Sequence, residues 1–290
     1  MATLLLVALA GFGAQFVSGT LGMGYGMTST TALVALGTAP ALASASAHFA
    51  QVGTSLASGV SHWRLANVDW RTVGILAGPG AVGAVVGAVV LVALPVGLAT
   101  GWITVILSLL GLYVLVRFAF LRLGRLITER RPGARFLAPL GLVAGFVDAA
   151  GGGGWGPVAT TTLLSSGRLE PRKVVGSVQA AEFVVTLAAS LAFLVALSLH
   201  GMNFAVVLGL LVGGMLAAPI GAVLVRRIPP RLLGTAAGGL IVLVNARPLL
   251  DVLRAPAPVV AVVHVALLAL VGTALTTAVR SARAERAESR

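Results

Sequence analysis

Two carboxyl groups lie inside apolar segments of this 290-residue chain, at Asp148 and Glu182. Each is the only acidic residue in its segment, and charged groups inside a membrane are costly, so they usually mark functional positions. Burial at low dielectric constant favours the protonated form of a carboxyl group. Both residues are therefore candidates to take up and release a proton.

Two further pairs of polar residues have the spacing i, i+3, which places both members on one face of a helix. The pairs are His48 with Gln51 and Gln179 with Glu182; Ser46 and Ser177 precede them at equal distances. We expect these faces to line a cavity, with His48 as a third candidate proton carrier.

Each of these residues also has a purely structural interpretation, and the sequence leaves the alternatives open. Asp148 could cap a helix end. Glu182 could make only an interhelical hydrogen bond, and His48 could be a neutral, hydrogen-bonded core residue.

Two glycine clusters interrupt the apolar segments, with the sequences LGMGYGMTSTT at 21–31 and GGGGWGPVATTT at 151–162. Aligned without gaps, both follow the pattern Gly-x-Gly-aromatic-Gly-x-x-x-Thr-Thr, which begins at Gly22 in the first cluster and at Gly152 in the second. Glycine tolerates positive φ angles and close backbone approach, so we expect both clusters to break helices.

Such breaks could bind an anion. Non-helical backbone occurs at membrane depth only where protein buries it or where it lines a wet cavity. The helix that follows a break presents unpaired N–H groups and the positive end of its dipole, and we expect Met27–Leu36 and Pro157–Ser165 to be such half-helices. Tight packing alone is the alternative. The predicted substrate-binding residues are Gly22, Met23, Gly24, Tyr25, Gly26, Thr28, Thr30, Gly152, Gly153, Gly154, Trp155, Gly156, Thr160 and Thr161, with Ser46, His48, Gln51, Ser177 and Gln179.

The composition indicates an all-α polytopic membrane protein. The chain is 58% hydrophobic and 10% charged, with a mean hydropathy of +1.03, whereas soluble domains carry about 25% charged residues. Long continuous apolar runs favour membrane helices over barrel strands. There is no cysteine, which excludes disulfides and thiol chemistry.

The chain divides at a basic linker, 122–135, into a first repeat (1–121) and a second repeat (136–250), followed by an extra helix (257–279) and a tail (280–290). Each repeat is expected to contain one broken hairpin and three helices. The hairpins are 3–37 and 136–166, and the helices are 41–62, 72–93 and 97–121 in the first repeat and 173–199, 203–225 and 232–250 in the second.

The distribution of the 20 basic residues supports hairpins that return to their starting side. If segments 3–37 and 136–166 crossed the membrane once, ten basic residues would lie on each side. If they return, 18 of the 20 share one side and only Arg247 and Arg254 lie opposite, as the positive-inside rule favours. Three full crossings per half then make the two repeats inverted, which is typical of secondary transporters.

The net charge of +12 is explained by basic loops, so we expect no nucleic-acid partner. An intramembrane enzyme is disfavoured because there is no HExxH or Gly-x-Ser-x-Gly motif and only one intramembrane aspartate. An anion channel remains an alternative, since a pore can also use helix N-termini.

The glycine-rich break after the first apolar run, its recurrence in the second half and the basic loop between the halves resemble the sulfite exporter TauE/SafE family. The similarity extends over about Leu9–Leu250. It implies a permease for sulfite, a sulfonate or another small organosulfur anion, with substrate-contacting loops at Gly22–Gly26 and Gly151–Gly156. Two features depart from the family pattern: Met23 and Tyr25 interrupt the first glycine run, and Met27 stands where many members have proline.

We therefore expect a secondary active transporter, for export rather than uptake, that binds its anion between the two glycine breaks. Protons are the candidate coupling ions, the lipid bilayer is the environment, and no cofactor or metal is expected. The expected location is a bacterial inner membrane, with the C-terminus in the cytoplasm.

Overall fold

A computed structural model describes residues 2–21, 23–120, 131–197, 203–224 and 230–288. Within these ranges the chain is helical, with short turns between the helices and no strand. The helices are α1 (Ala2–Leu21), α2 (Tyr25–Ala35), α3 (Pro40–Arg64), α4 (Trp70–Ala93), α5 (Val96–Ala119), α6 (Ala134–Gly151), a π-helical turn η1 (Gly156–Thr160), α7 (Thr161–Ser166), α8 (Pro171–Leu197), α9 (Phe204–Leu224), α10 (Pro230–Val252) and α11 (Ala257–Glu288).

Six helices in the described ranges are long and apolar enough to cross a membrane. They are α4, α5, α6, α8, α10 and α11, and α1 and α9 contain shorter apolar stretches. The chain is therefore a multi-pass α-helical membrane protein. α3 has a lower mean hydropathy because its buried face is polar, with Ser44, His48, Gln51 and Thr54 among its buried residues.

α11 runs beyond the predicted extra helix, through Glu288 instead of ending at 279. The sequence after 279 contains no glycine or proline, and its alanine, arginine and glutamate residues favour helix. Gly22, most of the linker 122–135 and the last residues of the predicted helices 97–121, 173–199 and 203–225 lie outside the described residues.

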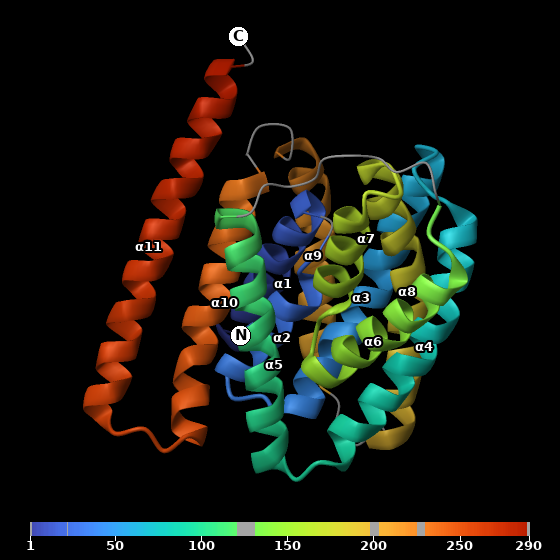
Figure 1. Cartoon of the computed structure of the whole chain (residues 1–290). Coiled ribbons are helices and arrows are strands. Elements are labelled where there is room, and N and C mark those ends of the chain that lie inside the picture. The colour runs from blue at the N-terminus through green and yellow to red at the C-terminus, as the bar shows by residue number, and fades with distance from the viewer. Residues whose placement is uncertain (1, 22, 121–130, 198–202, 225–229, 289–290) are drawn as a thin grey trace.

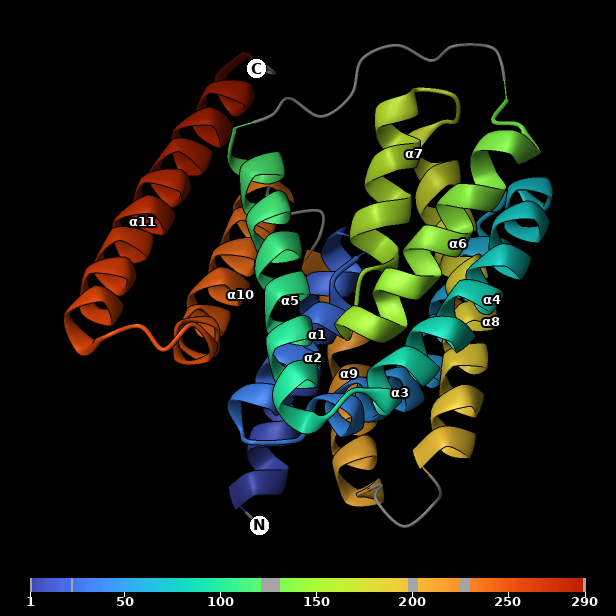
Figure 2. The same ribbon diagram turned by 60° about the horizontal axis from the view of Figure 1, so that its bottom comes forward.

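Both glycine clusters break their helices. Gly24 has a φ of +107°, and Gly152 and Gly153 have φ of +74° and +140°; glycine adopts such angles without strain. Figure 2 shows that α6 enters the molecule and that α7 returns to the end from which α6 started. The start of α1 and the end of α2 lie together at the opposite end (Figure 2).

Helices of the two halves make matching contacts. The largest helix–helix interfaces include α1 with α9, α4 with α6, α5 with α10, and α3 with α8. In the predicted repeat, α1, α3, α4 and α5 of the first half correspond to α6, α8, α9 and α10 of the second. The interface of α1 with α9 then corresponds to that of α6 with α4. The interfaces of α3 with α8 and of α5 with α10 each join two equivalent helices. α11 packs mainly on α10 at the edge of the bundle (Figure 1).

Individual residues repeat this relation. A Cβ atom on Gly11 would overlap the Leu210 carbonyl oxygen, and one on Gly141 would overlap the Leu76 carbonyl oxygen. Gly11 and Gly141 are 130 positions apart, as the glycine clusters are, and Leu76 and Leu210 are 134 apart, as the matching segments Gly83–Leu91 and Ala217–Val225 are. These equivalences support the predicted internal repeat. The inversion of its halves across the bilayer stays a prediction.

Close packing of α4 against α6 depends on glycine, which allows a testable prediction. A Cβ on Gly145 would overlap the Gly80 carbonyl oxygen, whereas a Cβ on Gly78 meets nothing within 4 Å. We expect Gly145→Ala to force the helices apart and to lower the thermal unfolding temperature in detergent. The matched control, Gly78→Ala, should leave it unchanged; equal unfolding temperatures would contradict this account of the interface.

Candidate functional site

The two glycine breaks meet in the centre of the bundle. A Cβ on Gly26 would lie only 2.8 Å from the Cα of Gly153, and one on Gly153 would overlap the backbone nitrogen of Met27. Glycine is therefore required at both positions for the loops to touch. The sequence predicted that the two breaks converge, and the structure places them in direct contact.

A narrow pocket lies at this junction, and in this conformation it has no space for a water-sized molecule. Its walls combine the two breaks with the polar faces of α3 and α8. The lining residues are Gly24, Gly26, Met27, Gln51, Asp148, Gly153, Gly154, Trp155, Gly156, Pro157 and Glu182.

Asp148 closes the second break from within. Its Oδ1 accepts hydrogen bonds from the backbone N–H groups of Gly154, at 2.7 Å, and Trp155, at 2.9 Å. Its Oδ2 lies 3.2 Å from Nε2 of His48. The side chain is 1% exposed. Asp148 therefore caps the first N–H groups after the break, which was the structural alternative for this residue.

His48 and Asp148 form a pair of zero net charge. Nδ1 of His48 lies 2.8 Å from the Ser44 carbonyl oxygen, so it must donate, and Nε2 faces the carboxyl group. Either both ring nitrogens carry protons and Asp148 is ionised, or Asp148 carries the second proton. Both arrangements leave the pair neutral in total. This pair therefore contributes no net charge to the pocket.

Glu182 is the pocket carboxyl group without a cationic partner. Oε1 accepts a 2.6 Å hydrogen bond from Nε2 of Gln51, and Gln179 is a further hydrogen-bond partner. Within the described ranges, no basic side chain forms an ion pair with Glu182. The residue is 5% exposed, so ionised Glu182 would place an uncompensated negative charge beside the two breaks.

The bond between Gln51 and Glu182 lies at the junction of the two halves. These residues are 131 positions apart, as are Ser55 and Thr186, whose hydroxyl oxygens lie 3.4 Å apart. This is also the separation of the predicted equivalents Ser46 and Ser177. The predicted symmetry between the halves would therefore have its axis between α3 and α8, beside the pocket.

The aromatic residues of the clusters anchor the breaks to the scaffold. The Tyr25 hydroxyl donates to the Leu210 carbonyl oxygen, and Trp155 Nε1 donates to the Val178 carbonyl oxygen. Tyr25 also packs against Gly214, and Trp155 packs against Gly80. Of the two aromatic residues, only Trp155 lines the pocket.

Several buried polar atoms near the breaks have no hydrogen-bond partner. They are the hydroxyl groups of Thr28, Thr30 and Thr160 and the Oε1 atom of Gln51. Unpaired buried polar atoms are rare in proteins and call for an explanation, such as a ligand or a change of conformation. Thr161, by contrast, donates its hydroxyl to the Pro157 carbonyl oxygen.

The structure does not bring every predicted residue to the pocket. The Ser177 hydroxyl accepts a hydrogen bond from the Asp69 backbone nitrogen, at 2.8 Å, and so holds the turn before α4. Ser46 and Met23 are buried outside the pocket lining, and Gln179 reaches it only through Glu182.

Sequence reasoning missed three residues that support the site. Ser44 donates to the Ala149 carbonyl oxygen and contacts His48. Asn245 of α10 donates to the Thr31 hydroxyl and so ties α2 to α10. Arg117 of α5 is 8% exposed and donates to the Ser165 hydroxyl near the end of α7. Asn245 could have been found, because it is a lone polar amide in an apolar segment.

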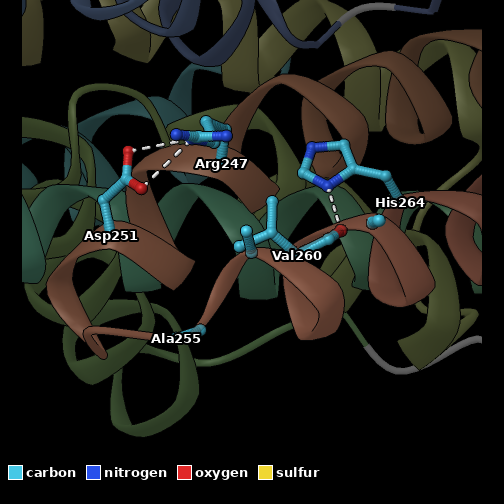
Figure 3. A pocket seen from close by; sticks show the side chains of 7 residues that line it. Arg247, Asp251, Ala255, Val260 and His264 are labelled. Carbon is cyan, nitrogen blue, oxygen red and sulfur yellow. Dashed lines mark hydrogen bonds and ion pairs between the residues drawn. The ribbon is translucent and has the colours of Figure 1, made fainter.

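A second pocket lies on the surface between the end of α10 and the start of α11 (Figure 3). It contains the exposed ion pair of Arg247 with Asp251 and the ring of His264, whose Nδ1 donates to the Val260 carbonyl oxygen. None of its lining residues belongs to the predicted site.

The sequence is similar to that of a known family of membrane proteins. The family model of the sulfite exporter TauE/SafE matches residues 7–248, which include both breaks and the pocket. The chain belongs to the TauE/SafE family. It is 48% identical over 252 residues to YtnM of Bacillus subtilis (strain 168), described as a "probable membrane transporter protein", with 87% of this chain and 84% of that protein covered. No solved structure matches the chain.

Membership of the TauE/SafE family makes this protein a membrane transporter and not an enzyme. The predicted family is thereby confirmed, as is the prediction of a membrane transporter; the substrate, the direction and the energy coupling stay predictions. Helix breaks that meet between two related halves occur in secondary transporters, where substrate binds at such a junction.

Proposed function

We propose that this TauE/SafE transporter exports a small sulfur-containing anion, such as sulfite or an organosulfonate, in exchange steps coupled to protons. The observation that carries the proposal is the pocket where the two glycine breaks meet beside Glu182. The sulfur chemistry comes from the description of the family.

The backbone supplies the affinity for an anion. α2 begins at Tyr25, and its flanking residues Gly24 and Gly26 line the pocket, so the positive end of its helix dipole lies at the junction. The unpaired hydroxyls of Thr28 and Thr30 are additional donors on the same helix.

Charge balance in the pocket links the anion to a proton. The pair of His48 and Asp148 has no net charge, whereas ionised Glu182 would repel an anion across a water-poor pocket. An anion therefore binds best when Glu182 is protonated. Loss of that proton would then favour release of the anion.

Contact between the breaks supports alternating access over an open pore. Gly26 and Gly153 touch, so no continuous channel passes between them in this conformation. We assign the end of the molecule that holds the turns at 64–70 and 166–171, and the C-terminus, to the cytoplasm of a bacterium, because its loops carry most of the basic residues.

Titration of the purified protein tests the proposal. We expect saturable binding of sulfite, sulfoacetate or thiosulfate, and counterflow of the bound anion across proteoliposomes. A channel would instead conduct current without counterflow. Binding of a cation or a neutral solute, with no affinity for any anion in the panel including sulfate, would overturn the proposal.

A further inference from the structure

The two glycine breaks are unequal as anion sites. Asp148, six residues before Gly154, places its carboxylate oxygen on the N–H groups of Gly154 and Trp155. The equivalent residue in the first half is Ser18, six residues before Gly24. Ser18 makes no such hydrogen bond to Gly24 or Tyr25, and among the described side chains none accepts from these two N–H groups.

The surroundings of the two breaks are otherwise matched. A Cβ on Gly24 would lie 3.4 Å from Cγ1 of Val17, and a Cβ on Gly154 would lie 2.7 Å from Cγ1 of Val147. Val17 and Val147 immediately precede Ser18 and Asp148. The last turn before each break therefore packs on the loop in the same way, and Ser18 takes the place of Asp148.

Asp148 thus shows how an oxyanion binds to this type of break. One carboxylate oxygen accepts two successive N–H groups, at 2.7 and 2.9 Å. The equivalent groups in the first half are the N–H groups of Gly24 and Tyr25, and Gly24 lines the pocket. An oxyanion from solution can therefore take at the first break the position that Asp148 takes at the second.

Gln51 adds an independent requirement. Its Oε1 is buried and has no partner, and it would lie 3.3 Å from a Cβ on Gly26, beside the first turn of α2. Its Nε2 is already used by Glu182. Oε1 can only accept a hydrogen bond, so the ligand that satisfies it must carry a hydrogen-bond donor.

We propose that the transported species is a hydrogen-bearing oxyanion, of the hydrogen sulfite type, bound at the first break alone. Its charged oxygen accepts from the N–H groups of Gly24 and Tyr25, and its O–H group donates to Oε1 of Gln51. This inference rests on the proposed function, because it assumes that the pocket binds a small anion.

Ser18→Asp tests the inequality of the breaks in the purified full-length protein. A carboxylate at 18 should occupy the N–H groups of Gly24 and Tyr25 and weaken the binding of sulfite by about 100-fold. Ser18→Asn introduces a side chain of the same size as aspartate but without charge, and it should weaken the binding of sulfite by less than about tenfold. Ser18→Ala should bind sulfite as the wild type does. Thermal unfolding in detergent checks that each variant is folded.

Gln51→Leu tests the O–H contact even if Ser18→Asp fails to fold. It should weaken the binding of sulfite but not of methanesulfonate, which has no O–H group. In a Glu182→Gln background, the affinity for total sulfite should fall by up to about tenfold per pH unit as hydrogen sulfite deprotonates, while the affinity for methanesulfonate stays constant.

Three outcomes separate this inference from the proposed function. A folded Ser18→Asp that binds sulfite as tightly as the wild type overturns the inference, and so does an equal loss of sulfite and methanesulfonate in Gln51→Leu. Absence of anion binding in the wild type overturns the proposed function itself.

Discussion

Replacing Asp148 with alanine should abolish transport and destabilise the protein. The substitution leaves the N–H groups of Gly154 and Trp155 and one nitrogen of His48 without a partner in a buried site. Removing one member of a buried ion pair costs about 3–5 kcal/mol. Displacement of the second break should lower the transport rate by about 100-fold or more, because small misplacements in a binding site have effects of that size.

Asp148→Asn is the matched control. Its Oδ1 can still accept from both N–H groups, and its amide N–H can donate to Nε2 of a neutral His48. We expect this variant to unfold close to the wild-type temperature and to keep most of the transport. The measurements are thermal unfolding in detergent and counterflow in proteoliposomes. If Asp148→Asn were as inactive as Asp148→Ala while remaining folded, Asp148 would act through its charge and not as a cap.

Replacing Glu182 with glutamine should uncouple transport from the proton gradient. The amide mimics the protonated carboxyl group, so the pocket stays permanently neutral and continues to bind the anion. We therefore expect anion exchange to be largely retained and pH-driven net flux to be lost. In the wild type, anion binding should strengthen as the pH falls, because protonation of Glu182 removes the negative charge; in the variant this contribution should be absent.

Glu170→Gln is the control for a general loss of acidic charge. Glu170 is exposed and lies just before α8, where it forms an ion pair with Arg172 in the first turn of that helix. Its replacement should leave pH-driven flux unchanged. Both variants are compared in proteoliposomes with an imposed pH gradient and a labelled anion. Unchanged pH-driven flux in Glu182→Gln would rule out Glu182 as the coupling group.

The asymmetry between the breaks connects these predictions. Asp148 satisfies the second break internally, and we propose that the first break binds the ligand. The neutral pair of His48 and Asp148 leaves Glu182 as the pocket group whose charge can change with the proton. This division of roles is consistent with the proposed proton-coupled carrier.

Much of this site was predictable from the sequence because the signals are local. The glycine clusters had to break helices, since their φ angles are accessible mainly to glycine. The position of Asp148 and Glu182 within apolar runs marked them as functional, because unpaired charge is costly in a membrane.

The sequence could not decide which role each polar residue has. Ser177 and Gln179 follow the same pattern as Ser46 and His48, but Ser177 holds the turn before α4, while His48 pairs with Asp148. The spacing i, i+3 fixes a shared helix face and not what that face meets. The lone amide of Asn245 was visible in the sequence, but its partner Thr31, 214 positions away, could be found only in the structure.

The sequence by itself determined a polytopic helical protein with two related halves, two helix breaks and two intramembrane carboxyl groups, because apolar length, glycine conformation and the cost of buried charge are properties of short segments. Only the tertiary structure decided that the breaks touch and that Asp148 caps the second of them. Those facts depend on the packing of helices that are distant in sequence, where a single Cβ atom at Gly26 or Gly153 would hold the loops apart.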